Sequence, residues 1–151
     1  GYADDDYASQ KAFAEELTDL ARAEGRHVLI VAHMRKGESE DKPVGKMAVK
    51  GSGGITDMVD TVVEVWRNKP REKAIEAAKE AALVAQTKDW LSFVPDKHRD
   101  APDTLLLVHK QRATGKEPTF ALWYDEETTQ YLAKSTHHPR PLMTINAVRA
   151  A

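Results

Sequence analysis

Apolar residues recur along the chain first with helical spacing and then with strand spacing. Phe13, Leu17 and Leu20 follow one another at helical intervals, which predicts a helix over residues 7–24. A continuous apolar run with β-branched members follows at residues 27–32, which is typical of a strand buried on both faces of a parallel sheet. The first part of the chain is therefore expected to be a helix that leads into a buried strand.

Three further apolar runs indicate strands, and two segments indicate helices. Residues 61–66 are rich in β-branched side chains. Residues 105–108 and 119–124 are separated by a short loop, so we expect them to pair as an antiparallel hairpin. The Ala-rich residues 70–88 have high helix propensity, and residues 55–60 could form a short helix. This order of elements predicts an α/β fold with flanking helices.

Composition narrows the classes of protein that fit. A length of 151 residues suits one domain, and 41% hydrophobic with 30% charged residues is typical of a folded globular protein. The net charge of -2 means that any surface for nucleic acid must be local. The absence of cysteine excludes disulfides and thiolate metal sites. No apolar run approaches the roughly 20 residues that a membrane-spanning helix needs.

Lys110 and Arg112 form the most informative charged pair. They lie two residues apart where a predicted strand ends, so both side chains should leave the same face. A planar, permanently charged guanidinium beside a compact ammonium suits a polyphosphate. A solvated strand end before a turn is the plain alternative for this pair.

A histidine and a glycine-rich loop are further candidate phosphate contacts. His33 follows the predicted strand over residues 27–32 and would lie at the carboxyl edge, where open α/β sheets bind ligands. Lys50 and Gly51 begin a glycine-rich loop whose backbone amides could approach a phosphate closely. The residue order of a nucleotide P-loop is absent. The alternatives are a satisfied histidine at a strand end and a flexible turn.

The segment of residues 34–54 is polar, basic and rich in glycine. Such a segment suits a nucleic-acid backbone, which it would contact through phosphates rather than bases. A solvated run of charges is the alternative. The cations that we single out in this segment are Arg35, Lys36 and Lys46.

Together and in this order, the motifs resemble the C-terminal half of the RecA-like motor domain of replicative hexameric DNA helicases. These include the phage primase-helicase, Twinkle and DnaB types. The matching segments are residues 27–36, 49–68 and 105–125. The resemblance implies a partial RecA-like (P-loop NTPase-like) sheet with flanking helices and a C-terminal antiparallel hairpin.

The resemblance also suggests how the chain is divided. Residues 1–132 match the C-terminal half of the helicase core, apart from an Ala-rich helical insertion at about residues 70–103. Residues 133–151 are expected to be a flexible tail. His137 and His138 lie in that tail, and we interpret them as part of it rather than as a metal site.

The resemblance assigns a role to each candidate residue. His33 matches a phosphate sensor. Lys110 and Arg112 match the pair that reaches the γ-phosphate of ATP held by a neighbouring subunit, with Arg112 as the arginine finger. Tyr124 matches an aromatic residue that stacks on a nucleotide base. The residues that fall in the DNA-contacting loops are Arg35, Lys36, Lys46, Lys50 and Gly51.

The chain departs from the family pattern in its nucleotide site. The Walker A motif, the catalytic Glu and the Walker B Asp are absent. Because Gly1 rather than Met starts the sequence, we expect these motifs upstream. We therefore expect ATP and Mg²⁺ to be cofactors of the full-length protein only, and the chain alone to be inactive. The implied partners are single-stranded DNA and further copies in a hexameric ring, with no membrane, in the cytoplasm of a bacterial or phage-infected cell.

Two other classes of function remain open from the sequence. A non-catalytic module that binds single-stranded DNA or mediates assembly would need no P-loop. Another RecA-like ATPase, such as a recombinase or a circadian-clock regulator, would also place a Lys-x-Arg pair and a histidine at strand ends. The spacing of the glycine-rich loop favours the helicase branch.

Overall fold

A four-stranded antiparallel sheet lies at the centre of the computed structural model, which describes residues 6–34, 39–49 and 53–141. The strands are β1 (Thr61–Arg67), β2 (Thr104–Gln111), β3 (Thr119–Asp125) and β4 (Gln130–Leu132), in that spatial order. The predicted α/β class is confirmed, and so is the antiparallel hairpin, which β2 and β3 form. Strand β4 extends that hairpin and was not predicted from the sequence.

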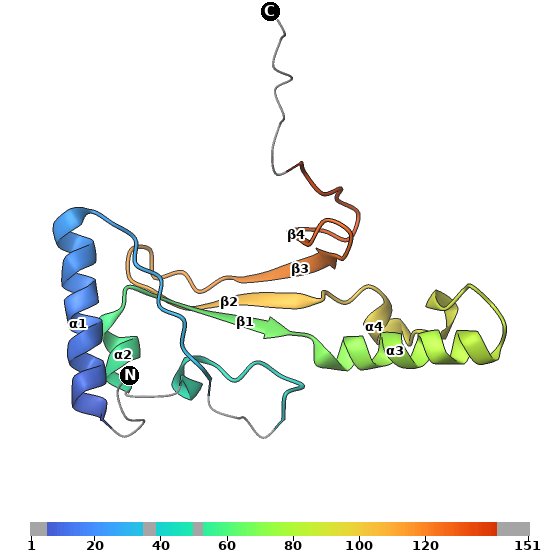
Figure 1. Cartoon of the computed structure of the whole chain (residues 1–151), viewed down its shortest axis with the longest axis horizontal. Coiled ribbons are helices and arrows are strands. Elements are labelled where there is room, and N and C mark those ends of the chain that lie inside the picture. The colour runs from blue at the N-terminus through green and yellow to red at the C-terminus, as the bar shows by residue number, and fades with distance from the viewer. Residues whose placement is uncertain (1–5, 35–38, 50–52, 142–151) are drawn as a thin grey trace, which may run out of the picture.

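Helices lie at the two ends of the sheet rather than over its faces (Figure 1). They are α1 (Tyr7–Glu24), α2 (Gly53–Met58), α3 (Lys69–Val84) and α4 (Asp96–Arg99), with short 3₁₀ turns η1 (Lys46–Ala48) and η2 (Leu91–Phe93). Helix α1 packs on α2 at one end, and α3 packs on α4 and η2 at the other. No helix within the described ranges is long and apolar enough to cross a membrane.

Side-chain N-caps explain where the two long helices, α1 and α3, begin. The Asp6 side chain accepts a hydrogen bond from the backbone N–H of Ser9 at 3.1 Å and caps α1. Asn68 caps α3 in the same way by accepting from Arg71 N–H at 3.2 Å. The helix predicted over residues 7–24 is confirmed as α1. Those predicted over residues 55–60 and within residues 70–88 are confirmed as α2 and α3, with small shifts at their ends.

A β-bulge in β2 changes which side chains share a face. Val62 pairs with Lys110 and Val63 pairs with Val108, so His109 is the extra residue on β2. Cross-strand partners lie on the same face, and so do residues two apart in one strand. The bulge therefore brings Lys110 to the face that carries Val62.

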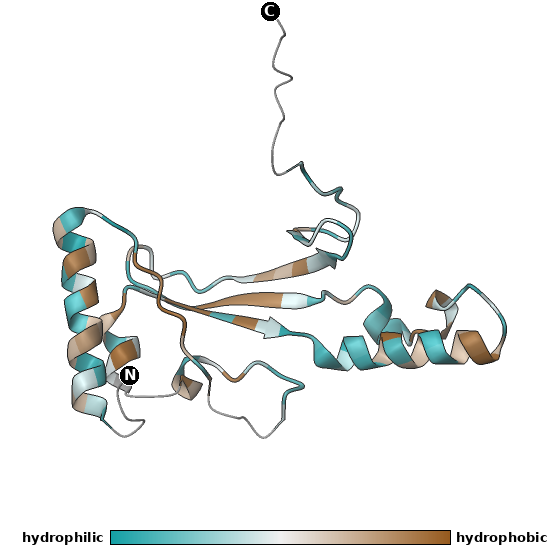
Figure 2. Cartoon of the chain, viewed as in Figure 1, coloured by the Kyte–Doolittle hydropathy of each residue, from teal (hydrophilic) through white to brown (hydrophobic). Residues whose placement is uncertain are grey.

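The opposite face of the sheet is apolar and largely uncovered. Val63, Val65 and Phe120 lie on it and are 46%, 66% and 48% exposed. Figure 2 shows the hydrophobic stretches along the strands with no helix over them. Within the described residues, no large side chain is fully buried, and the buried apolar residues are Ala14, Ala78, Ala82 and Val94. Exposed apolar surface of this kind is typical of interfaces.

The parallel strand predicted over residues 27–32 is wrong. This segment belongs to no strand, and Leu29 and Val31 are 92% and 89% exposed. A buried parallel strand needs a hydrogen-bonded neighbour on each side. Every pairing within the described sheet is antiparallel, and none of it includes this segment. His33 therefore does not follow a strand, contrary to the expectation from the sequence.

Candidate anion-binding site

Lys110 and Arg112, which we call the fork, lie side by side at the end of β2. The Lys110 ammonium donates to the carbonyl oxygens of Thr56 at 2.7 Å and Asp57 at 2.9 Å. The Arg112 guanidinium donates to the same Asp57 oxygen at 2.5 Å. These acceptors belong to the last turn of α2, where helix carbonyls lack partners within the helix. The expectation that the two cations share one face and converge is met.

Asp60 adds a carboxylate to the fork. Its Oδ1 accepts from Arg112 at 3.3 Å and from Arg22 of α1 at 3.4 Å. The backbone N–H of Arg112 also donates to the Asp60 carbonyl at 3.0 Å. Both arginine–aspartate pairs are about half exposed, so they orient the side chains more than they stabilise the fold.

Neighbouring charges perturb the Lys110 ammonium. Partial burial lowers the pKa of Lys110, and repulsion from Arg112 and from Lys46 lowers it further. The carboxylates of Asp57 and Asp60 oppose this shift. The shift shows that Lys110 lies in a crowded, partly desolvated group of charges.

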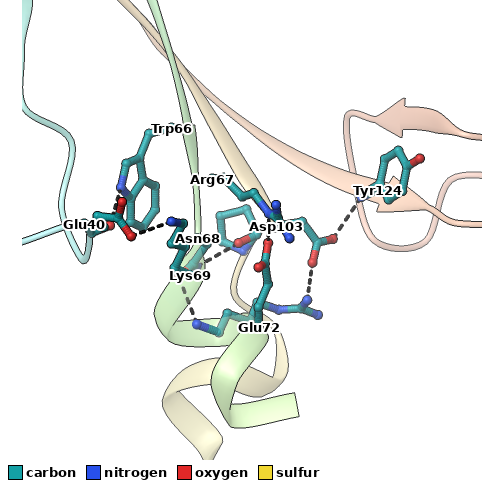
Figure 3. Close-up of polar contacts among 10 residues, drawn as sticks. Glu40, Trp66, Arg67, Asn68, Lys69, Glu72, Asp103 and Tyr124 are labelled. Carbon is teal, nitrogen blue, oxygen red and sulfur yellow. Dashed lines mark hydrogen bonds and ion pairs between the residues drawn. The ribbon is translucent and has the colours of Figure 1, made fainter. Parts of the chain in front are cut away.

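A loop of residues 39–49 lies on the Val62 face of β1. It is part of the basic segment of residues 34–54, and we call it the basic loop; within it Lys42 and Lys46 are balanced by Glu40 and Asp41. The Trp66 indole N–H donates to the Glu40 carbonyl at 3.2 Å, and Lys69 forms an ion pair with the Glu40 carboxylate (Figure 3). The loop returns to an isolated bridge between Met34 and Val49. The loop is thereby held against the same face of the sheet that carries Lys110.

Glu64 of β1 holds the middle of the basic loop. One carboxylate oxygen accepts from Val44 N–H at 2.9 Å, and the other accepts from Gly45 N–H at 2.9 Å and from His109 Nε2 at 2.6 Å. Gly45 has φ of 81°, a conformation that favours glycine. We call this arrangement the Glu64 clamp.

The Glu64 clamp keeps a nearly buried carboxylate charged. The side chain is 5% exposed. Burial alone would raise the pKa of Glu64, but the hydrogen bonds from Val44, His109 and Gly45 together hold the pKa below its ordinary value. Sequence reasoning missed both Glu64 and His109. The available signal was a charged residue between valines at an inward position of a strand.

The structure brings together some of the residues expected to bind anions. Lys110, Arg112 and Lys46 lie at one end of the sheet, where Lys46 is close enough to affect Lys110. His33 is exposed and lies in the segment without strand structure. The remaining expected DNA contacts, namely Arg35, Lys36, Lys50 and Gly51, lie outside the described residues.

Tyr124 lies at the opposite end of the sheet from the fork. Tyr124 lies two residues beyond Leu122 in β3, and Leu122 pairs with Thr104 at the start of β2. The six residue steps from Thr104 to Lys110 span about 20 Å at the usual strand rise. The Tyr124 ring packs on Tyr131, with ring centroids 5.1 Å apart and planes tilted by 51°.

Asp103 connects the Tyr124 end of the sheet to the helices α3 and α4. Its carboxylate accepts from Tyr124 N–H at 2.9 Å and forms an ion pair with Arg71 of α3 (Figure 3). Arg71 also donates to the His98 carbonyl of α4 at 3.1 Å. Asn68 N–H donates to the Asp103 carbonyl at 2.8 Å, which ties the end of β1 to the start of β2.

Neither protein-family models nor curated protein sequences match the chain. In the part of the chain that the structure describes, no three His, Asp or Glu residues gather as metal ligands would.

Proposed function

We propose that the chain is the C-terminal part of the RecA-like motor of a replicative DNA helicase that works as a ring. In this role the fork contacts the terminal phosphate of ATP held by a neighbouring subunit, and the basic loop contacts single-stranded DNA. The convergence of Lys110 and Arg112 on one oxygen acceptor, with Lys46 nearby, is the observation that carries the proposal.

The residues of the fork fit a terminal phosphate. A guanidinium and an ammonium that already share an oxygen acceptor could exchange it for phosphate oxygens, to which they would bind more strongly. Arg112 is 46% exposed and is thus accessible to another subunit. ATP, when bound, supplies the phosphoryl group whose transfer to water drives the motor. Under the proposed function, the Mg²⁺ ligands belong with the P-loop of the neighbouring subunit.

The position of Tyr124 supports a site shared between subunits. A base stacked on Tyr124 and a phosphate at the fork would be about 20 Å or more apart along the sheet. This is too far for one nucleotide within a single copy. Under the proposal, Tyr124 therefore contacts one ATP and the fork contacts another.

The decisive experiment is the Arg112→Ala variant of the helicase subunit that contains this chain. Removing an arginine finger is expected to lower kcat for ATP hydrolysis by about 10³–10⁵ while ATP affinity changes little. Arg99→Ala is the matched control, because Arg99 is an arginine of α4 at the other end of the sheet. Equal turnover in the Arg112 variant and the control would refute the proposed role.

A further inference from the structure

The Glu64 clamp connects two segments that are more than 60 positions apart in the sequence. The Gly45 amide and the His109 imidazole meet on the same carboxylate oxygen, Oε2 of Glu64. Lys46 directly follows Gly45, and Lys110 directly follows His109. A single oxygen atom thus fixes the relative position of the backbone from which both lysines extend.

The basic loop has a second anchor that differs from the clamp. Trp66, which pairs with Leu105 of β2, and Lys69 hold Glu40 near the start of the described loop, away from the bulge at His109. The clamp contacts both the loop and the bulge that precedes the fork. Of these two anchors, the clamp is the one that also contacts the residue directly before the fork.

A carboxylate is well suited to hold the basic loop in place. Two consecutive backbone N–H groups directed at one anion form a strong and directional site. A buried carboxylate is costly unless hydrogen-bonded, and here both oxygens have donors. Replacing Glu64 with Ala would leave the Val44 and Gly45 amides without these acceptors, so the loop should lose its fixed position.

We propose that Glu64 is a positioning residue that holds Lys46 beside Lys110, so that the basic loop and the fork act as one cationic surface. The identification of DNA as the ligand of that surface rests on the proposed function. The positioning itself rests only on the geometry of the clamp.

A double-mutant cycle on the whole chain tests the proposal, with a fluorescent oligo-dT as the probe. Loss of one phosphate contact to a single strand lowers the slope of log affinity against log salt by about 0.7. Lys46→Ala and Glu64→Ala should each have this effect, and the double variant should show a decrease of about 0.7 rather than about 1.4. Loss of folded protein would reduce the binding-competent fraction but would not change the slope.

Two control variants separate positioning from general damage. Trp66→Phe removes the indole N–H donor of the other loop anchor and should leave the slope unchanged. Lys97→Ala removes a lysine of α4 at the far end of the sheet and should also leave it unchanged. Additive effects of Glu64→Ala and Lys46→Ala, or an unchanged slope in Glu64→Ala alone, would overturn the proposal.

A distance measurement gives a readout that does not depend on DNA. The chain has no cysteine, so spin labels can be placed at Met47→Cys in the loop and Lys116→Cys beyond β2, both exposed positions. The distance distribution should be narrow and should broaden in Glu64→Ala. An unchanged distribution would overturn the positioning role. Broadening without oligo-dT binding in any variant would instead refute the DNA-binding function and leave the positioning role supported.

Discussion

Lys110 and Arg112 donate hydrogen bonds to the same atom, the carbonyl oxygen of Asp57, at 2.9 and 2.5 Å. Two cations at this separation repel each other, and this repulsion contributes to the lowered pKa of Lys110. The partial negative charge at the C-terminal end of α2 offsets the repulsion. The fork is thus arranged within the chain before any ligand binds, which reduces the ordering that a ligand must impose.

Lys110→Ala should destabilise the chain by about 1 kcal/mol, because the last carbonyls of α2 lose two charge-assisted hydrogen bonds. Because the site is accessible to solvent, water molecules can replace part of the lost hydrogen bonding to the α2 carbonyls. The measurement is the urea midpoint at neutral pH. Lys97→Ala is the charge-matched control and should change stability by less than about 0.5 kcal/mol. Equal midpoints for the two variants would show that the fork does not hold α2.

The Glu64 clamp predicts a loss of stability in acid. The folded-state pKa of Glu64 is below its ordinary value of 4.5, so the native state binds this proton less readily than the unfolded state does. The resulting stabilisation is fully present above the unfolded pKa and is lost as pH falls through the folded pKa. The free energy of unfolding, measured from neutral pH down through this range, should fall more steeply for the wild type than for Glu64→Gln.

The hydrogen bonds of the clamp also predict how stable the Glu64→Gln variant is at neutral pH. A glutamine at position 64 offers one acceptor oxygen, so it can satisfy only part of the set formed by Val44, Gly45 and His109. At neutral pH the Glu64→Gln variant should therefore be less stable, and the two curves should converge in acid. Parallel curves would mean that the carboxylate does not carry the pH dependence.

Elements that depend on local sequence were predictable. Helix α1 follows from the spacing of Phe13, Leu17 and Leu20, and the hairpin of β2 and β3 follows from two apolar runs joined by a short loop. The segment of residues 27–32 has an equally strong pattern but forms no strand. A strand exists only through non-local hydrogen bonds, and an apolar run alone does not specify a partner.

The candidate site was predictable only in part, for a similar reason. The fork follows from the spacing of Lys110 and Arg112. The clamp depends on the bulge at His109, which shifts the register by one residue and is set by tertiary structure. The sequence shows a lone glutamate among valines and a histidine 45 positions away, and no local pattern relates them.

Asp103→Ala should destabilise the chain by about 1–3 kcal/mol. It leaves Arg71 without its carboxylate, and that guanidinium is 15% exposed. It also removes the acceptor for Tyr124 N–H. Thermal unfolding measures the effect. Asp96→Ala is the matched control, because Asp96 also pairs with an arginine but is 92% exposed, and it should cost less than about 0.5 kcal/mol. Similar losses in both would exclude a special role for Asp103.

Oligo-dT binding to the chain should weaken steeply with salt. Each phosphate contact in single strands contributes a slope of about 0.7 in log affinity against log salt. The fork and Lys46 provide three cations at one end of the sheet, so the slope should be about 2 or more. Fluorescence anisotropy between about 50 and 200 mM salt measures it. A flat response would contradict binding through phosphates.

Subunit mixing should reveal whether the fork acts on a neighbour's ATP. Under the proposed function, Arg112→Ala and a variant without the P-loop lysine, each made in the full-length subunit, should each be inactive in ATP hydrolysis. Mixed rings should recover activity, because some interfaces then combine an intact P-loop with an intact Arg112 from the adjacent subunit. Arg112 can act in this way because it is exposed at the sheet end and already oriented by Asp57 and Asp60. No recovery on mixing, with rings verified by size, would mean that the fork does not act across the interface.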